Sequence, residues 1–457
     1  MNTPIVEFVK KYIKSNIVRA HMPGHKGESV LGCEQFDITE IKGADSLFEC
    51  ESIIKESEQN AGSLFNAHTF YSTEGSSLCI RAMLYLTLLY AKKEGKAPLV
   101  LAGRNAHKTF LSAVALLDFE VEWLYPENGT YLSVDITAEH LDDKLSKMSV
   151  SPVAIYLTSP DYLGNTLDIK GISKVCKKHG VLLLVDNAHG AYLKFLGNSQ
   201  HPLDLGADLC CDSAHKTLPV LTGGAYLHIS KNADILLSQK AKIALSLFAS
   251  TSPSYLIMQS LDMANLYLSD GYREKLNAFI KKVDVLKSDL LENGYTLTGD
   301  EPLKVTINAK HYGYTGIELA ELLREKNVEC EFADPDFLVL MLTPSLKDSE
   351  LIKIKDALMD IKKHEEIKTT KLPFCIPKRV MSVRDAVMSL SKTVKVKDSI
   401  GKVLSTATVS CPPAVPVLVS GELIDENALS LFEYYNITEC EIVVDIIPDV
   451  SRYNTPT

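Results

Sequence analysis

The 457-residue chain has the composition of an ordinary folded protein, with 46% apolar and 23% charged residues. Its length predicts two or three domains around a large buried core. The net charge of −10, without a block of like charges, argues against nucleic acid or an anionic membrane surface as a partner. The ten cysteines are scattered and lack the paired CxxC spacing of zinc sites, so no metal is expected.

The N-terminal residues lack the apolar core of a signal peptide. No run approaches the roughly 18 apolar residues of a membrane-spanning helix. We therefore expect a cytoplasmic protein in a reducing compartment.

The chain begins with a short amphipathic helix, predicted over 4–15 from a proline near its start and apolar residues at helical spacing. Residues 21–27 (HMPGHKG) then form a loop, because proline and glycine rule out regular structure. This loop carries His21, His25 and Lys26, to which the sequence assigns no role.

Residues 72–78 (STEGSSL) precede a strongly apolar helix. A glycine and two hydroxyls at a helix N-terminus form an anion site, because the first backbone N–H groups are unpaired and the helix dipole is positive there. The sequence therefore predicts a phosphate site at Gly75, Ser76 and Ser77. The alternative is that Ser76 is only an N-cap residue.

Apolar strands alternate with helical stretches through the middle of the chain, and this alternation predicts a mostly parallel sheet with right-handed crossovers. His107 follows the first of these strands, at the mouth of a helix. The expected strands are 98–102, 119–124, 152–158, 181–186 and 207–211, with a helix over 168–179.

Two neighbouring strands lead to side chains that can carry chemistry. Five apolar residues between Gly180 and Asp186 predict a buried parallel strand with Asp186 at its C-terminal end. The next strand, 207–211, leads to Lys216 in a loop. Because ligands of open α/β sheets sit outside the carboxyl ends of the strands, we expect Asp186 and Lys216 at one site.

A lysine and an aspartate in this order are typical of a pyridoxal 5′-phosphate (PLP) enzyme, in which the lysine holds the aldehyde as a Schiff base and the aspartate pairs with the ring nitrogen. A lysine amine is mostly protonated at neutral pH, so its pKa must be lowered before it attacks. We expect His215 and an apolar surround to do this. The alternative is a solvated surface lysine.

The remaining chain suggests two further domains. A strand is expected over 222–230, where paired glycines permit close backbone approach. Later elements are expected as helices over 233–247, 253–293 and 316–326 and strands over 303–309 and 336–342. The predicted domains are a large PLP-binding domain (1–295), a small α/β domain (296–365) and a C-terminal α+β domain (366–457).

Several separated motifs resemble, in order, those of the ornithine/lysine/arginine decarboxylase family of PLP enzymes. They cover nearly the whole chain and lie at 21–27, 37–40 (DITE), 72–77 (STEGSS), 105–110 (NAHKTF), 185–190 (VDNAHG), 213–228 (SAHKTLPVLTGGAYLH) and 411–422 (CPPAVPVLVSGE). The resemblance implies an aspartate aminotransferase-like large domain. Many relatives carry PPGIP where this chain has PPAVP, which puts in doubt any contact that needs the backbone freedom of that glycine.

The resemblance implies PLP-dependent α-decarboxylation of a basic amino acid, in polyamine metabolism, by a homodimer whose sites lie between subunits. Lys216 would hold PLP, Asp186 would keep its ring nitrogen protonated, and His215 or Lys216 would return a proton to Cα. His107 would stack on the ring, Gly75, Ser76, Ser77 and Ser213 would contact the phosphate, and His189 would support Asp186 or the cofactor. For His189 the alternative is packing at the strand end.

Other readings stay open. An aminotransferase or lyase of the same fold is the nearest alternative, although Arg324, the only arginine between Asp300 and Lys378, resembles part of a solvated helix face rather than a carboxylate clamp. A non-catalytic relative is another. The residues do not decide which basic amino acid is the substrate; arginine or lysine is favoured over ornithine, and the acids that contact its head group are expected from a second subunit or the C-terminal domain.

Overall fold

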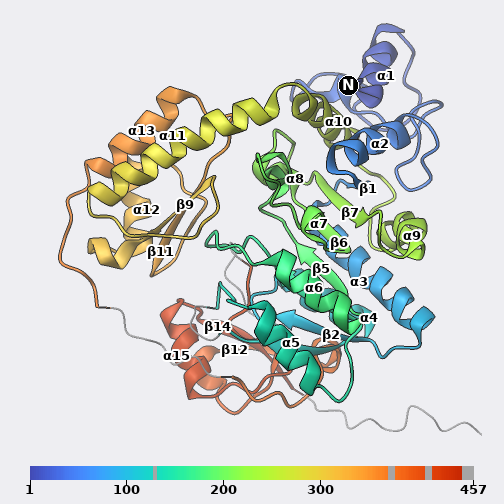
Figure 1. Ribbon diagram of the computed structural model, residues 1–457. Helices are drawn as coiled ribbons and strands as arrows, with labels where there is room; N and C mark the ends of the chain where they lie inside the picture. The colour runs from blue at the N-terminus through green and yellow to red at the C-terminus, as the bar shows by residue number, and fades with distance from the viewer. Residues whose placement is uncertain (127–130, 369–375, 407–413, 445–457) are drawn as a thin grey trace, which may run out of the picture.

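The computed structural model describes residues 1–126, 131–368, 376–406 and 414–444. Figure 1 shows a large body that holds the main sheet, a smaller layer built from α11 to α13, and a C-terminal unit that carries α15. The chain starts with α1 (Pro4–Lys14), a 3-10 helix η1 (Glu34–Phe36) and α2 (Ile53–Phe65). α1 buries Ile5, Val6 and Val9 on one face, as its apolar spacing predicted.

The main sheet has seven strands in the order β1-β7-β6-β5-β4-β2-β3. β2 to β6 pair in parallel, whereas β7 runs antiparallel to both of its neighbours. The mostly parallel sheet predicted from the alternating pattern is therefore present. The strands are β1 (Ala67–Ser72), β2 (Leu99–Gly103), β3 (Glu120–Leu124), β4 (Ala154–Thr158), β5 (Leu182–Asp186), β6 (Leu209–Asp212) and β7 (Ala225–Ser230).

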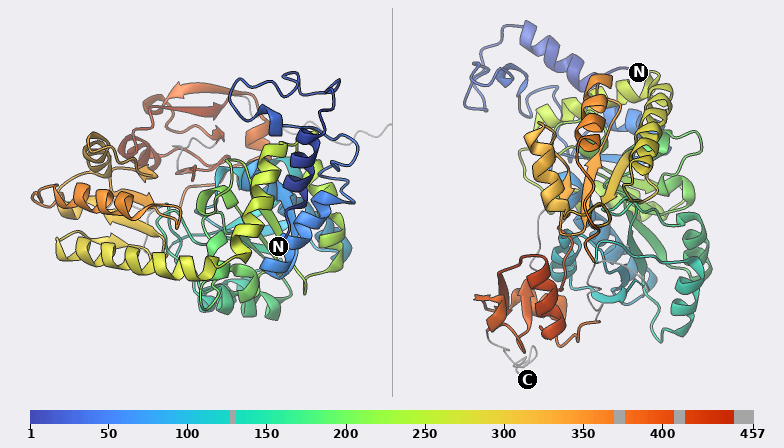
Figure 2. Two further views of the ribbon diagram at one scale, coloured as in Figure 1. Left: turned by 90° about the horizontal axis from the view of Figure 1, so that it is seen from above. Right: turned by 90° about the vertical axis from the view of Figure 1, so that its left-hand side faces the viewer.

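Helices bury both faces of this sheet, so its central strands are apolar throughout. One core packs the sheet against α3, α4 and α9, and a second packs it against α5 and α6. Figure 2 shows the same arrangement from above and from the side. The helices of the large body are α3 (Gly75–Glu94), α4 (Lys108–Leu117), α5 (Ala138–Lys147), α6 (Ile169–His179), α7 (Pro202–Leu205), α8 (Ala214–Thr217), α9 (Ile235–Ser246), α10 (Tyr255–Ser269) and α11 (Tyr272–Glu292), with the 3-10 helix η2 (Ala191–Phe195).

Two expectations about this part of the chain are wrong in detail. The single helix expected over 253–293 is two helices, α10 and α11, because Gly271 takes a positive φ of 66° between them. Lys216 lies on the short helix α8 rather than in a loop. The paired glycines precede β7, and a side chain at Gly223 would meet the carbonyl oxygen of Thr73 at 2.8 Å, so the predicted close backbone approach is present.

The second sheet is antiparallel, in the order β10-β11-β9-β8. α11, α12 and α13 accompany it, and α11 leads to it from the large body (Figure 1). Its elements are β8 (Leu297–Thr298), β9 (Lys304–Asn308), η3 (Ala309–Tyr312), α12 (Gly316–Glu325), β10 (Phe332–Ala333), β11 (Phe337–Met341) and α13 (Asp348–Met359).

The third sheet, β12-β14-β13, is also antiparallel and belongs to the C-terminal part. The buried ion pair Arg104–Glu422, 3.2 Å long, ties this part to the main sheet. Its elements are α14 (Val383–Met388), β12 (Ser391–Lys395), η4 (Val396–Asp398), β13 (Leu404–Thr406), α15 (Glu426–Tyr434) and β14 (Glu439–Val443). The three sheets follow one another along the chain, while the domain boundaries at 295 and 365 stay a prediction.

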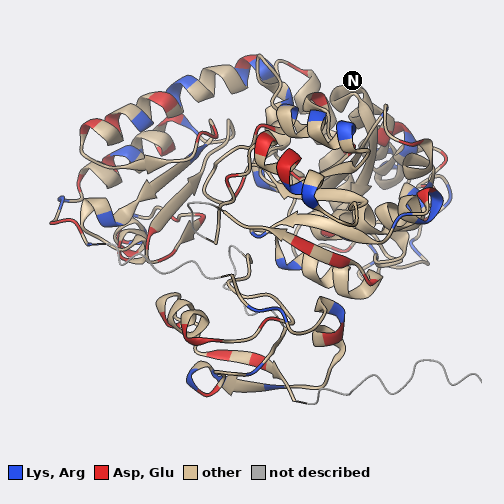
Figure 3. Cartoon of the chain, turned by 60° about the horizontal axis from the view of Figure 1, so that its bottom comes forward, with Lys and Arg blue, Asp and Glu red and all other residues tan. Residues whose placement is uncertain are grey.

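Charged residues of both signs are interleaved over the helices, as Figure 3 shows. This distribution matches a sequence without blocks of like charge. Within the described ranges, no helix has both the length and the apolar character needed to cross a membrane.

Candidate active site

A pocket of about 230 Å³ lies at the carboxyl ends of β4 and β5, where a mostly parallel sheet binds its ligands. The structure brings Asp186, Lys216, His107 and His189 together in its wall. The complete lining among the described residues is Asn105, His107, Leu132, Thr158, Pro160, Tyr162, Asp186, Ala188, His189, Lys216, Glu331, Ala414 and Val415.

Asp186 ends β5 as a carboxylate that is only 2% exposed. It accepts hydrogen bonds from the hydroxyl of Tyr156 at 3.0 Å and from the backbone N–H of Ala188 at 3.2 Å. No ion pair joins it to a cation in the described part of the chain. A buried carboxylate with neutral donors alone is costly, so this site is suited to a ligand that brings its own positive charge.

Lys216 projects from α8 into the same pocket. Burial lowers the pKa of its amine, and the cation of Lys304 lowers that pKa further, while Asp186 and Glu331 act in the opposite direction. The lowered pKa favours the neutral, nucleophilic amine. The predicted surface-loop alternative is therefore wrong, because this amine is held inside the protein.

His189 contacts the lysine directly: its Nε2 lies 2.7 Å from Nζ of Lys216. Its other ring nitrogen, Nδ1, lies 3.0 Å from Nζ of Lys304 on β9. Burial lowers the pKa of His189 well below its usual value, and both lysines add to this shift. His189 therefore contacts the amine of Lys216 rather than Asp186.

The N-terminus of α3 carries the predicted phosphate residues. The hydroxyl of Ser213 donates to that of Ser76 at 2.8 Å, so the two segments meet. Ser76 and Ser77 occupy the first turn, where a helix supplies no internal acceptor for backbone N–H groups, and Glu74 at the N-cap makes no side-chain cap bond. The N–H of Gly75 differs, because it donates to the carbonyl of Gly223 at 2.7 Å.

His107 caps α4 through its side chain, with Nδ1 accepting from the backbone N–H of Thr109 at 3.2 Å. Burial lowers its pKa to about 4, so the imidazole is neutral at neutral pH. The hydroxyl of Thr109 also lies 3.1 Å from that of Ser77, which links His107 to the N-terminus of α3.

His215 differs from its expected place. Its Nδ1 lies 3.0 Å from the carbonyl oxygen of Gly224, and it is not among the described residues that line the pocket. The cation that lowers the pKa of Lys216 is Lys304 rather than His215. His21 and His25 make local contacts, to Tyr12 at 2.7 Å and to Asp37 at 3.2 Å.

Sequence reasoning missed several wall residues because they come from distant segments. Thr158 ends β4 beside Asp186, and its buried hydroxyl has no hydrogen-bond partner among the described residues. Glu331, directly before β10, brings a carboxylate that accepts a hydrogen bond from the hydroxyl of Tyr162 at 3.0 Å. Ala414, at the glycine position of the family motif, takes a positive φ of 57° in the pocket wall. The family motif at 411–422 was the sequence signal for Ala414. Residues 411–413 of that motif lie outside the described residues.

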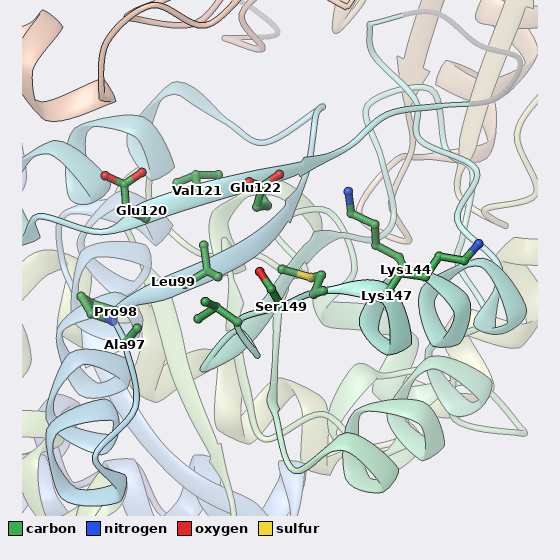
Figure 4. Close-up of a pocket in the computed structure, with 11 residues that line it drawn as sticks. Ala97, Pro98, Leu99, Glu120, Val121, Glu122, Lys144, Lys147 and Ser149 are labelled. Atoms are coloured by element: carbon green, nitrogen blue, oxygen red, sulfur yellow. The ribbon is translucent and has the colours of Figure 1, made fainter.

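A larger hollow of about 520 Å³ lies between β3 and α5. Figure 4 shows Glu120 and Glu122 on the strand, with Lys144 and Lys147 on the helix. Its floor is formed at the amino ends of β2 and β3, opposite to the edge that carries Asp186. It is therefore separate from the site built around Lys216.

Comparison with known proteins bears on what this geometry serves. Residues 3–307 match the family model described as "Orn/Lys/Arg decarboxylase, major domain". The chain belongs to the Orn/Lys/Arg decarboxylase family. It is 27% identical to an arginine decarboxylase of Halalkalibacterium halodurans, over 95% of this chain and 93% of that protein. An arginine decarboxylase of Bacillus subtilis is likewise 27% identical, over 94% and 92% of the two chains.

Solved structures of lysine decarboxylases share the fold of this family member. Lysine decarboxylase A from Pseudomonas aeruginosa superposes with a TM-score of 0.78 at 16% identity, covering 96% of this chain and 80% of that one. The family predicted from the motifs and the fold class are confirmed. So is the class of enzyme, a decarboxylase of basic amino acids, which rules against the aminotransferase and non-catalytic readings.

Proposed function

We propose that this decarboxylase uses PLP, held by Lys216, to remove CO₂ from arginine or lysine, and less readily from ornithine. The observation that carries the proposal is that one pocket pairs the Lys216 amine, whose pKa is lowered by burial, with the buried carboxylate of Asp186, which forms no ion pair within the described residues. PLP suits both groups, because its aldehyde can react with the amine and its protonated ring nitrogen can pair with the carboxylate.

The surrounding residues fit the rest of the cofactor. The hydroxyls of Ser76, Ser77 and Ser213 lie at the N-terminus of α3, which suits a phosphate group, and the neutral imidazole of His107 lies in the pocket wall. The hydroxyl of Thr158, which has no partner in the described part of the chain, offers one more hydrogen bond. When bound, PLP supplies an electron sink for the pair that remains on the substrate after CO₂ leaves.

The chain's own side chains do the remaining work. Asp186 holds the proton of the ring nitrogen, because its fixed negative charge favours the protonated form. A proton must return to Cα of the substrate after CO₂ departs. The amine of Lys216 is the better candidate for its donor, because Lys216 lines the pocket. His215 is the weaker candidate, because its ring contacts the carbonyl oxygen of Gly224 instead.

The substrate end of the proposal is supported by Glu331. Its carboxylate lies in the pocket wall with Lys216 and is exposed to solvent, so it can attract a cationic side chain. The small α/β part of the chain thus contributes an acid that the sequence reasoning expected from a second subunit or from the C-terminal part. Guanidinium and ammonium head groups both suit a carboxylate partner.

We further propose a homodimer that acts in polyamine metabolism in the cytoplasm. Support for a second subunit comes from the segment after α1, where Val18, Val30 and Leu31 are 84 to 87% exposed. Several highly exposed apolar side chains on one segment favour a surface that a second subunit covers. Light scattering of the purified protein measures the mass that decides this point.

The deciding experiment is to incubate the enzyme with arginine, lysine and ornithine and to measure CO₂ and the three amines. Lys216→Ala is expected to abolish both the visible absorbance of bound PLP and product formation, because no other residue replaces the buried amine. Lys281→Ala, at an exposed lysine of α11, is the control and should retain both. Product at the wild-type rate from Lys216→Ala would refute the proposed mechanism.

A further inference from the structure

The imidazole of His189 lies between two lysine amines. Nζ of Lys216 is 2.7 Å from Nε2, and Nζ of Lys304 is 3.0 Å from Nδ1. His189 and Lys304 are 4% and 3% exposed, so water does not compete for these contacts. Lys304 is the first residue of β9 in the second sheet, far along the chain from Asp186 and Lys216.

Lys304 is held in place by two further partners. Its Nζ forms an ion pair with Oε2 of Glu301 at 2.9 Å and donates to the carbonyl oxygen of Asp161 at 3.1 Å. The hydroxyl of Tyr192 donates to Oε1 of Glu301 at 3.2 Å, which fixes the carboxylate in turn. An ammonium carries three N–H donors and no acceptor. The ion pair with Glu301 and the hydrogen bond to Asp161 therefore hold the ammonium beside His189, its third neighbour.

This arrangement decides where the single ring proton of His189 lies. Because the ammonium of Lys304 only donates, Nδ1 of His189 must accept, and the ring proton must be on Nε2. An Nε2–H group 2.7 Å from Lys216 donates to that amine, which then has to offer its lone pair. An amine that offers its lone pair is neutral and ready to attack an aldehyde.

We infer that Lys304, paired with Glu301, is a positioning residue that fixes His189 as the Nε2–H tautomer and so presents Lys216 as a neutral nucleophile. The inference deepens the proposed function, on which it rests for the role of the Lys216 amine. It concerns the protein before substrate binds, so it can be tested without decarboxylation.

The charges around the two groups agree with this assignment. Burial, Lys216 and Lys304 all lower the pKa of His189, so the ring carries one proton at neutral pH. Around Lys216, burial and Lys304 lower the amine pKa, whereas Asp186, Glu331 and Cys211 raise it. The carbonyl of Asp161 raises the pKa of His189 and is the competing acceptor, toward which an Nδ1–H would turn if Lys304 were absent.

The first test reads the tautomer in the cofactor-free, full-length protein. Long-range proton–nitrogen NMR spectra of ¹⁵N-histidine protein, with His189 assigned from a His189→Gln variant, should show a protonated Nε2 and an unprotonated Nδ1. In Lys304→Met/Glu301→Gln, which removes both members of the ion pair and leaves no unpaired buried charge, the Nδ1–H form should appear. Lys304→Arg keeps a cation with N–H donors and should restore the wild-type spectrum.

The second test follows the rate at which added PLP attaches to the same proteins, as absorbance against pH. Loss of the Lys304 cation should raise the apparent pKa of Lys216 by about one unit, which is about tenfold slower attachment near neutral pH. Lys287→Met is the matched control, since Lys287 donates to the carbonyl oxygens of Glu301 and Pro302 without reaching His189.

Two results would overturn the inference: a protonated Nδ1 in the wild-type protein, or an unchanged spectrum and pH profile in the double variant. Failure of the proposed function looks different. A protein that shows the Nε2–H tautomer and binds PLP yet releases no CO₂ would refute the function and leave the role of Lys304 standing.

Discussion

At the scale of single residues, Asp186 is the group whose surroundings say most about the chemistry. Its carboxylate is buried at the end of β5 and accepts hydrogen bonds from the hydroxyl of Tyr156 and the backbone N–H of Ala188. A buried carboxylate that forms no ion pair within the described ranges favours a positively charged ligand group beside it. The proposed partner is the protonated ring nitrogen of PLP.

We predict that Asp186→Ala retains part of the cofactor but loses activity by about 10²–10³-fold, the range for removal of one preorganised electrostatic group. The reason is that a neutral pyridine ring withdraws electrons poorly. Steady-state kcat and the absorbance of bound PLP measure the two effects separately. Asp186→Asn keeps the shape and the contact with Tyr156 and should be as slow; a near-normal rate in either variant would remove Asp186 from this role.

At the scale of elements, α1 is held by a side chain of another helix. Its N-cap residue, Thr3, makes no side-chain cap bond. Instead, the carboxylate of Asp262 on α10 accepts from the backbone N–H groups of Ile5 and Val6 at 3.0 and 3.1 Å and from the hydroxyl of Ser57 at 2.6 Å. Asp262 thus caps α1 and joins it to α2 and α10.

Burial raises the pKa of Asp262 to about 6, and this predicts a pH dependence of stability. The folded protein binds the proton more tightly than the unfolded chain, so this group adds to the free energy of unfolding as pH falls from about 6 to about 4, and the gain is absent above pH 6. Asp262→Asn should flatten this part of the pH profile, measured by thermal unfolding. A profile identical to wild type would contradict the assignment.

Asp262→Ala leaves the N–H groups of Ile5 and Val6 and the hydroxyl of Ser57 without their acceptor. The expected cost is about 1–3 kcal/mol for each buried group left unpaired. Because the loss is local to α1, hydrogen exchange of residues 4–14 is the appropriate measurement. Asp262→Asn, which keeps one oxygen for the two N–H groups, is the matched control and should protect α1 almost as well as wild type.

Local patterns in the sequence predict most of these elements because burial on both faces of a parallel sheet leaves continuous apolar runs, as in β5. The break between α10 and α11 was missed, although Gly271 was a readable signal for it. In the site, Asp186 and Lys216 were predictable because Asp186 ends a strand and Lys216 comes shortly after the next one. Lys304, Glu301 and Glu331 were not, since pairing between distant segments leaves no local pattern.

At the scale of the whole molecule, the C-terminal part completes the pocket of the main body. Ala414 and Val415 lie in the pocket wall, and the backbone N–H of Lys108 donates to the carbonyl of Ala414 at 2.9 Å. Just beyond them, Arg104 donates to the carbonyls of Pro416 and Val417 at 3.0 and 3.1 Å. The same guanidinium forms the buried ion pair with Glu422.

We predict that Arg104→Met loosens this attachment by about 3–5 kcal/mol, because it leaves the carboxylate of Glu422 buried without its partner. Faster hydrogen exchange of residues 414–423 would show the loss, together with a raised KM for substrate. Arg104→Met/Glu422→Met removes both charges and should recover most of the protection. If the double variant is as loose as the single one, the ion pair is not what holds the segment.

The position of Ala414 and Val415 along the chain also matters for how the enzyme is made. The ribosome synthesises Asp186 and Lys216 long before Ala414 and Val415. A nascent chain can therefore form its main sheet while the pocket still lacks the wall residues of the C-terminal part. A prematurely terminated product that ends before residue 414 would carry Lys216 without this part of the pocket wall. Completion of translation is therefore itself a condition for a closed pocket.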